Sequence, residues 1–261
     1  MSTVRSPSRA LVLVTNDDGI DSVGIRALAT ALERGGYDVV VAAPAVNVSG
    51  VAAAIGPIDP RVPVRKVELT GVTGDAFAVS APPAMIVIAA INGAFGPKPV
   101  AVASGVNAGV NLGRAILHSG TVGAALTGHN LGLRAVAVSA QPGGDFDVAA
   151  EWGVAFLQQI FDSDSARLAN INVPRHADRS TRCLETRLAS YGAVTAAMAG
   201  DALDFRLTIE PEAFAEEGTD AVAVRDSFVS VTWLTGLSIE VPATRPSTRE
   251  PKVALTTVRA E

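Results

Sequence analysis

Short apolar runs alternate with helical patterns along the first two thirds of the chain, and this alternation constrains the fold more than any other feature. Residues 10–14 form an apolar run that ends at a polar cluster, which is typical of a buried parallel strand. Apolar residues at helical spacing follow over 25–32, Gly35 and Gly36 close that helix, and a second apolar run covers 39–43. Strand, helix and strand in this order predict a βαβ unit of a parallel sheet with a right-handed crossover.

The alternation continues as far as residue 161 and then changes. Further strands are expected at 76–79, 100–103 and 135–139. Further helices are expected at 83–91, from a cap at Ser119 or Thr121 to about residue 131, and at 145–161. After Pro174, a period-two pattern over 203–209 and an apolar run at 228–234 predict strands. The predicted fold class is therefore α/β, with a three-layer α/β/α core at 1–174, a β-rich extension at 175–240 and a flexible C-terminal tail at 241–261.

Composition excludes several classes of protein. The chain has 261 residues of which 48% are hydrophobic, so it can bury a substantial core and does not have the composition of a disordered protein. Cys183 is the only cysteine, which excludes a disulfide scaffold and a four-cysteine zinc site. The net charge of −5 argues against a surface that coats a nucleic-acid polymer. No apolar stretch approaches the roughly 20 residues that span a bilayer, and the N-terminus lacks a secretory signal, so we expect a cytoplasmic protein without a membrane partner.

A polar cluster stands where the first strand ends. Asn16, Asp17, Asp18 and Gly19 follow one another directly after the apolar run. In parallel α/β sheets, ligands bind at the carboxyl ends of strands. Two adjacent carboxylates repel each other unless a cation lies between them, and a divalent cation takes oxygen ligands. An ordinary turn explains the same four residues equally well, so this motif alone leaves both interpretations open.

Two further loops follow predicted strands. Asn47 and Ser49 offer neutral oxygens close to the end of the second strand, although an ordinary polar loop has the same composition. The stretch 104–113, which contains Asn107 and Asn111, is rich in glycine and asparagine. Loops of this kind present backbone N–H groups to phosphate oxygens, and the alternative is a long surface connection.

A candidate phosphate site opens the helix that follows. Ser119, Gly120 and Thr121 stand at its expected start, where free N–H groups, the helix dipole and hydroxyl groups favour an anion. A serine or threonine at this place is also the commonest N-cap. The preceding His118 has the chemistry of an acid or base near neutral pH, and the alternative is a packed or hydrogen-bonded histidine.

Taken together, these motifs resemble the SurE family of survival-protein nucleotidases, which are metal-dependent 5′/3′-nucleotide phosphatases. The resemblance extends over about 11–234 and is carried by the motifs at 16–20, 47–50, 104–113, 119–125 and 170–174 and by the late matches at 219–220 and 228–232. It implies a Rossmann-like core, a C-terminal segment exchanged between subunits, and a homodimer or homotetramer.

The resemblance also implies the chemistry of the site. The divalent metal ion would be Mg²⁺ or Mn²⁺, and the implied ligands are Asp17, Asp18, Ser49 and Asn107. Catalysis is assigned to Asp17 and Asp18. Substrate contacts are expected from Asn16, Gly19, Asn47, Asn111, His118, Ser119, Gly120 and Thr121.

The chain departs from the family pattern around these residues. Ala45 and Val46 stand where the family usually has Asp and Arg, the acid usual within 81–85 is missing, and His118 replaces the usual Tyr. The implied metal ligands are intact, so we expect hydrolysis of a small phosphate ester, a nucleoside monophosphate, with the substrate choice in question. The alternatives are a phosphatase for a non-standard nucleotide or another metabolite phosphate, and a nucleotide-binding regulatory protein with little turnover.

Overall fold

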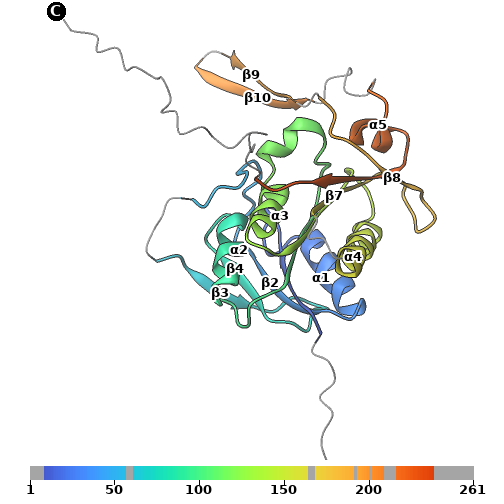
Figure 1. The fold of residues 1–261 in the computed structure, drawn as a ribbon. Coiled ribbons are helices and arrows are strands. Elements are labelled where there is room, and N and C mark those ends of the chain that lie inside the picture. Colours follow the sequence, from blue (N-terminus) through green and yellow to red (C-terminus); the bar gives the residue numbers. More distant parts are fainter. Residues whose placement is uncertain are drawn as a thin grey trace, which may run out of the picture.

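A nine-stranded sheet forms the centre of the molecule (Figure 1). The computed structural model describes residues 9–56, 61–163, 168–190, 193–199, 201–208 and 216–237. The order across the main sheet is β3-β4-β2-β1-β5-β6-β7-β11-β8. The strands are β1 (Leu11–Thr15), β2 (Asp38–Pro44), β3 (Val64–Val67), β4 (Ala76–Val79), β5 (Ala101–Asn107), β6 (Arg134–Ala140), β7 (Leu168–Val173), β8 (Cys183–Glu185) and β11 (Val229–Leu234).

The central strands β4, β2, β1, β5, β6 and β7 are parallel, as the alternation of strands and helices predicts. Val12 of β1 pairs with Val39 of β2 on one side and with Ala101 of β5 on the other. At the edges, β3 pairs antiparallel with β4, and β11 pairs antiparallel with β7 and parallel with β8. Two strands of the expected extension, β8 and β11, therefore belong to the main sheet.

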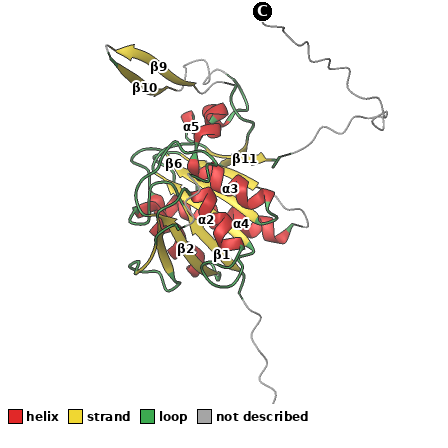
Figure 2. Cartoon of the chain, turned by 90° about the vertical axis from the view of Figure 1, so that its left-hand side faces the viewer, coloured by secondary structure: helices red, strands yellow, loops and turns green. Residues whose placement is uncertain are grey.

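Helices cover both faces of the sheet and give the predicted three layers (Figure 2). One apolar cluster joins α1 (Val23–Arg34) and α4 (Phe146–Asp162) to the sheet, and a second joins α2 (Pro83–Ile91) and α3 (Gly120–Asn130) to its opposite face. Neighbouring residues of β1 divide between them, because Val12 packs in the first cluster and Leu13 in the second. Leu28 of α1 is fully buried, and a buried leucine of this kind contributes about 1.5–3 kcal/mol.

Side-chain caps fix where three of these helices begin. Ser22 accepts a hydrogen bond from the Ile25 N–H and opens α1, and Asp145 opens α4 by accepting from N–H groups of its first turn. Ser119 caps α3 by accepting from the Val122 N–H at 3.1 Å. Ser119, rather than Thr121, is therefore the cap of the helix that follows the Gly/Asn-rich loop.

The chain beyond β7 adds elements that the sequence only partly predicts. The expected strands at 203–209 and 228–234 correspond to β10 (Ala202–Thr208) and β11. β10 pairs with β9 (Ala193–Ala199) in a separate antiparallel hairpin. The short helix α5 (Asp220–Arg225) was not expected. Ile209 and the predicted tail at 241–261 lie outside the described residues. In the described part of the chain, no helix has the length and apolar character needed to cross a membrane.

Candidate active site

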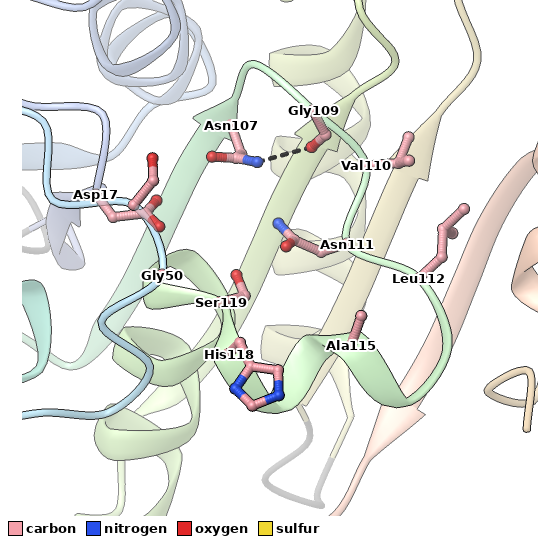
Figure 3. A pocket seen from close by; sticks show the side chains of 11 residues that line it. Asp17, Gly50, Asn107, Gly109, Val110, Asn111, Leu112, Ala115, His118 and Ser119 are labelled. Atoms are coloured by element: carbon pink, nitrogen blue, oxygen red, sulfur yellow. Dashed lines mark hydrogen bonds between the residues drawn. The ribbon is translucent and has the colours of Figure 1, made fainter. Parts of the chain in front are cut away.

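The site lies where the chain changes direction across the sheet. From β1 the chain proceeds to β2 and β4 on one side, and it then returns to β5, β6 and β7 on the other. Crevices at such a switch point, outside the carboxyl ends of the strands, are the usual ligand sites of this architecture. A cavity of about 410 Å³ opens here (Figure 3). Its lining residues are Asp17, Ser49, Gly50, Asn107, Gly109, Val110, Asn111, Leu112, Ala115, His118 and Ser119.

Asp17 lines the cavity and is held by the first turn of α3. Its side chain is only 3% exposed. One carboxylate oxygen accepts a hydrogen bond from the Gly120 N–H at 3.1 Å, and the other accepts one from the Thr121 hydroxyl. A carboxylate is favoured here because the N-terminus of a helix carries a partial positive charge. Gly120 and Thr121, which were expected to contact substrate, thus fix the direction of Asp17.

Asp18 lies next to the cavity and is less buried than Asp17. Its two oxygens accept hydrogen bonds from the Asn47 amide at 3.2 Å and from the Ala108 N–H at 3.1 Å. The pKa of the Asp18 carboxyl is raised above its usual value, mainly by burial and further by the negative charge of Asp17. The hydrogen bonds from Ala108 and Asn47 lower this pKa and offset only part of the increase. The two adjacent carboxylates therefore repel each other, as the sequence indicates.

The turn between β1 and α1 is built by Asn16 and Gly19. Asn16 is fully buried, and its amide donates to the Gly19 carbonyl at 3.1 Å and to the Ser22 hydroxyl at 2.7 Å. Its side-chain oxygen accepts from the Gly19 N–H at 3.2 Å. Gly19 has a φ of 100°, which an L side chain rarely adopts. Both residues shape the turn and neither lines the cavity.

Asn107 ends β5 and lines the cavity together with Asp17. The strand continues past the expected end at residue 103 because Ser104 and Asn107 still pair with β6, with a shift of register between them. The Asn107 amide donates to the Gly109 carbonyl at 2.7 Å. Figure 3 shows its side-chain oxygen on the Asp17 side of the cavity. This oxygen is thus available to a ligand.

Asn111 is fixed by a network of amides and hydroxyls behind the cavity. Its amide donates to the Ser139 hydroxyl at 2.8 Å, and its backbone N–H donates to the Asn172 side chain at 2.7 Å. The amides of Asn170 and Asn172 both donate to the Asn111 carbonyl at 2.9 Å. The loop that forms one wall of the cavity is therefore tied to β6 and β7.

The other side of the cavity mixes polar and apolar groups. Ser119 is buried and His118 is exposed, and both line the cavity. An apolar wall is supplied by Val110, Leu112 and Ala115, whose contact with the cavity could not be predicted from the sequence. No pattern distinguishes such residues from the rest of a loop before the fold is known.

The structure brings together half of the twelve residues singled out from the sequence. The cavity lining includes Asp17, Ser49, Asn107, Asn111, His118 and Ser119. Asp18, Asn47, Gly120 and Thr121 form a surrounding layer, through hydrogen bonds to one another, to Asp17 and to Ala108. Asn16 and Gly19 belong to the turn.

The donor set around Asp17 fits a hard divalent cation. In the described ranges, neither Asp17 nor Asp18 forms an ion pair with a lysine or arginine. Ser49 and Asn107, which both carry a side-chain oxygen, line the same cavity. Among these described residues, no group of three or more His, Cys, Asp or Glu side chains could hold a metal, so a cation here would rely on two carboxylates and neutral oxygens. Such a set suits Mg²⁺ or Mn²⁺ better than a soft metal.

Comparison with known proteins decides the family. The sequence profile described as Survival protein SurE matches residues 12–205. The chain belongs to the SurE family. A relative named 5′-nucleotidase SurE from Desulfitobacterium hafniense is 35% identical over 237 residues, which cover 85% of this chain and 89% of the relative. A relative named 5′-nucleotidase SurE 1 from Thermus thermophilus is 37% identical over 235 residues, covering 85% of this chain and 90% of the relative.

The SurE fold is also found in a solved structure. The crystal structure of the SurE protein from Aquifex aeolicus is 30% identical and superposes with a TM-score of 0.70, covering 86% of this chain and 92% of the other. This match confirms the predicted mixed α/β fold and the resemblance to the SurE family. The cavity described above lies within the part of the chain that the SurE profile covers.

Proposed function

We propose that this SurE protein is a phosphomonoesterase that hydrolyses nucleoside monophosphates with the help of Mg²⁺ or Mn²⁺. The observation that carries the proposal is the position of Asp17, which lines the cavity and lies directly against the first turn of α3. Curated relatives that match over most of the chain are named 5′-nucleotidase SurE, which supports the same substrate class.

Asp17, Asp18, Ser49 and Asn107 are the residues that would hold the cation. When bound, it would neutralise charge on the phosphoryl oxygens and lower the pKa of a coordinated water. The role of Asp17 is to present a carboxylate whose direction is fixed by α3, and the role of Asn107 is to present a neutral oxygen from the end of β5. Asp17 is held by a backbone N–H group of α3, and Asn107 stands at the end of strand β5, so both side chains are in place before substrate arrives.

Hydrogen-bond donors at the start of α3 would orient the phosphoryl group. The Ser119 oxygen accepts the Val122 N–H, which leaves the hydroxyl proton of Ser119 to donate to a phosphoryl oxygen. Ser119 also stands at the N-terminus of α3, where the helix dipole favours negative charge. Donors that are in place before the reaction stabilise the charge that develops in the transition state.

The substrate class is tested by release of inorganic phosphate. The purified protein is incubated with Mg²⁺ or Mn²⁺ and a panel of 5′- and 3′-nucleoside monophosphates, sugar phosphates and other metabolite phosphates. We expect the nucleoside monophosphates to have the highest kcat/KM. Preference for another ester would show that the protein is a phosphatase whose substrate is not a nucleoside monophosphate. Binding of nucleotides without phosphate release would favour a regulatory nucleotide-binding protein.

We also propose that the protein is a homodimer or homotetramer. Among the described strands, β9 and β10 pair only with each other, away from the main sheet (Figure 2). An isolated two-stranded hairpin is only marginally stable in water, and a partner subunit would give it support. Light scattering should therefore give at least twice the monomer mass, and a monomer at micromolar concentration would contradict the proposal.

A further inference from the structure

The fully buried carboxylate of Asp220 lies outside the cavity, at the start of α5. Its side chain is 0% exposed, and no arginine or lysine of the described residues forms an ion pair with it. Burying a charge is costly unless hydrogen bonds compensate for it. The bonds that Asp220 accepts therefore indicate what this residue does.

Three backbone N–H groups from separate segments donate to Asp220. The Gly113 N–H donates to one oxygen at 2.8 Å. The N–H groups of Ala189 and Ala221 donate to the other oxygen, both at 2.9 Å. Burial raises the pKa of the Asp220 carboxyl above its usual value, and these N–H groups offset only part of that increase. The carboxylate thus joins α5, the segment after β8 and the end of the cavity loop.

The loop that Asp220 holds contributes much of the cavity lining. Gly109, Val110, Asn111 and Leu112 all line the cavity, and Gly113 follows them directly. Leu112 is 5% exposed and packs with Ala189, Ala221 and Val224 in a small apolar cluster separate from the main core. The wall of the cavity therefore rests on α5, which is more than a hundred residues later in the chain.

We propose that Asp220 is a positioning residue for substrate binding, because its carboxylate holds the loop 109–113 in the shape that forms the cavity wall. The amide network fixes the loop at Asn111, and Asp220 fixes it at Gly113. Asp220 does not line the cavity, and its described hydrogen bonds do not reach the proposed metal ligands. Its loss should therefore weaken the binding of substrate more than the chemical step.

The requirement for a carboxylate follows from the hydrogen bonds. All three neighbours donate, and both carboxylate oxygens accept. Asparagine has the same shape, but it has only one accepting oxygen, and its amide hydrogens would face an N–H group. Asp220→Asn therefore loses the bond to Gly113 or the bonds to Ala189 and Ala221, with almost no change of volume.

Thr219→Ala is a matched control on the neighbouring residue. Thr219 is also fully buried and caps α5, with its hydroxyl donating to the Glu216 carbonyl at 2.7 Å and accepting from the Val222 N–H at 3.4 Å. Neither of these partners belongs to the cavity loop. Thr219→Ala should destabilise α5 in a similar way and leave the Gly113 contact in place.

The first measurement is steady-state kinetics, and it rests on the proposed function. With a nucleoside monophosphate and saturating Mg²⁺, D220N should raise KM about ten-fold and change kcat less than about three-fold, as expected for the loss of at least one charge-assisted hydrogen bond. T219A should leave KM within about two-fold of wild type. Equal KM values for D220N and wild type, or equal increases in both variants, would overturn the proposal.

The second measurement does not depend on activity. Hydrogen exchange should be slow at the Gly113 amide of the wild-type protein, because this donor is buried and bonded. Exchange across 109–113 should accelerate at least about ten-fold in D220N and remain unchanged in T219A. Free exchange at Gly113 in wild type overturns the proposal even if D220N does not fold. An inactive wild type with the expected exchange pattern would reject the nucleotidase and leave the positioning role supported.

Discussion

Gly120 lies against Asp17 so closely that even one methyl group should displace the carboxylate. A Cβ atom added at Gly120 would lie 2.7 Å from the Asp17 Cβ and 2.8 Å from one of its carboxylate oxygens. Ordinary contacts begin at 3.4 Å, so Gly120→Ala must move Asp17 or α3 by roughly 0.7 Å. Catalytic groups need to be placed within about 0.5 Å, and an error of about 1 Å can cost roughly 100-fold in rate.

We therefore expect G120A to lower kcat/KM by about 30- to 100-fold, which corresponds to roughly 2–3 kcal/mol of transition-state stabilisation. The backbone itself is not strained, because Gly120 is an ordinary helical residue. Overpacking should cost about 1–3 kcal/mol of stability, which leaves the protein folded at room temperature. The assay is phosphate release with saturating Mg²⁺, combined with thermal unfolding of the same preparation.

Gly128→Ala is the control in the same helix. A Cβ at Gly128 would collide with the side chain of Val102 in the core, away from Asp17. G128A should therefore lose stability while it keeps most of its activity. Activity of G120A within about three-fold of wild type would refute the link between the Gly120 contact and the placement of Asp17. A loss of activity in G128A as large as in G120A would also refute it, because overpacking of α3 alone would then explain both.

Three further predictions concern groups around and outside the cavity. His118→Ala should raise KM or change the order of preferred substrates, with a smaller loss of kcat than Asp17→Asn, and unchanged kinetics across the panel would show that His118 has no role in recognition. Burial raises the pKa of the Cys183 thiol from 9.0 to about 11, so at pH ~8 a thiol reagent should label it roughly 100-fold more slowly in the native than in the unfolded protein, and rapid native labelling would contradict this. Arg179 donates to both oxygens of Glu151 at 2.6 and 2.7 Å and lowers the pKa of that carboxyl, so the pair stabilises above the unfolded pKa of Glu151 and stops doing so as the pH falls through the lowered folded value. Arg179→Ala should accordingly lower the unfolding temperature slightly near neutral pH and not at a pH below both values, and a difference that persists in acid would point to lost packing instead.

The sequence predicts the core of this fold well because its strands are fully buried. Continuous apolar runs such as 39–43 cannot face water on either side, so they require helices on both faces of a parallel sheet. The start of α3 was predicted to within two residues, because Ser119 and Thr121 can each cap a helix. In the structure Ser119 is the cap.

Elements set by long-range pairing were predicted less well. β5 continues to Asn107 through a serine and a glycine because β6 provides hydrogen-bond partners, which local composition does not reveal. α5 has six residues, too few for a helical period to be visible. The position of β11 between β7 and β8 depends on contacts between distant segments.

In the candidate site, too, residues next to predicted strands could be found from the sequence, and contacts between distant segments could not. Asp17 and Asn107 were found because each follows a predicted strand, and the carboxyl ends of neighbouring parallel strands meet at one edge. Asn16 was expected to touch substrate, and its amide instead holds the turn. The support that Asp220 gives to the cavity loop could not be found from the sequence, because its partner Gly113 is distant in the chain and donates through its backbone.

Asp17 and Asp18 are proposed to hold a divalent cation for phosphate-ester hydrolysis, and phosphate release from the best nucleoside monophosphate before and after chelation tests this directly. We expect excess chelator to abolish release and Mg²⁺ or Mn²⁺ to restore it. Asp17→Asn and Asp18→Asn should lose at least about 100-fold in kcat while their unfolding remains cooperative. Full turnover in excess chelator, or in either variant, would show that hydrolysis does not need a cation held by Asp17 and Asp18.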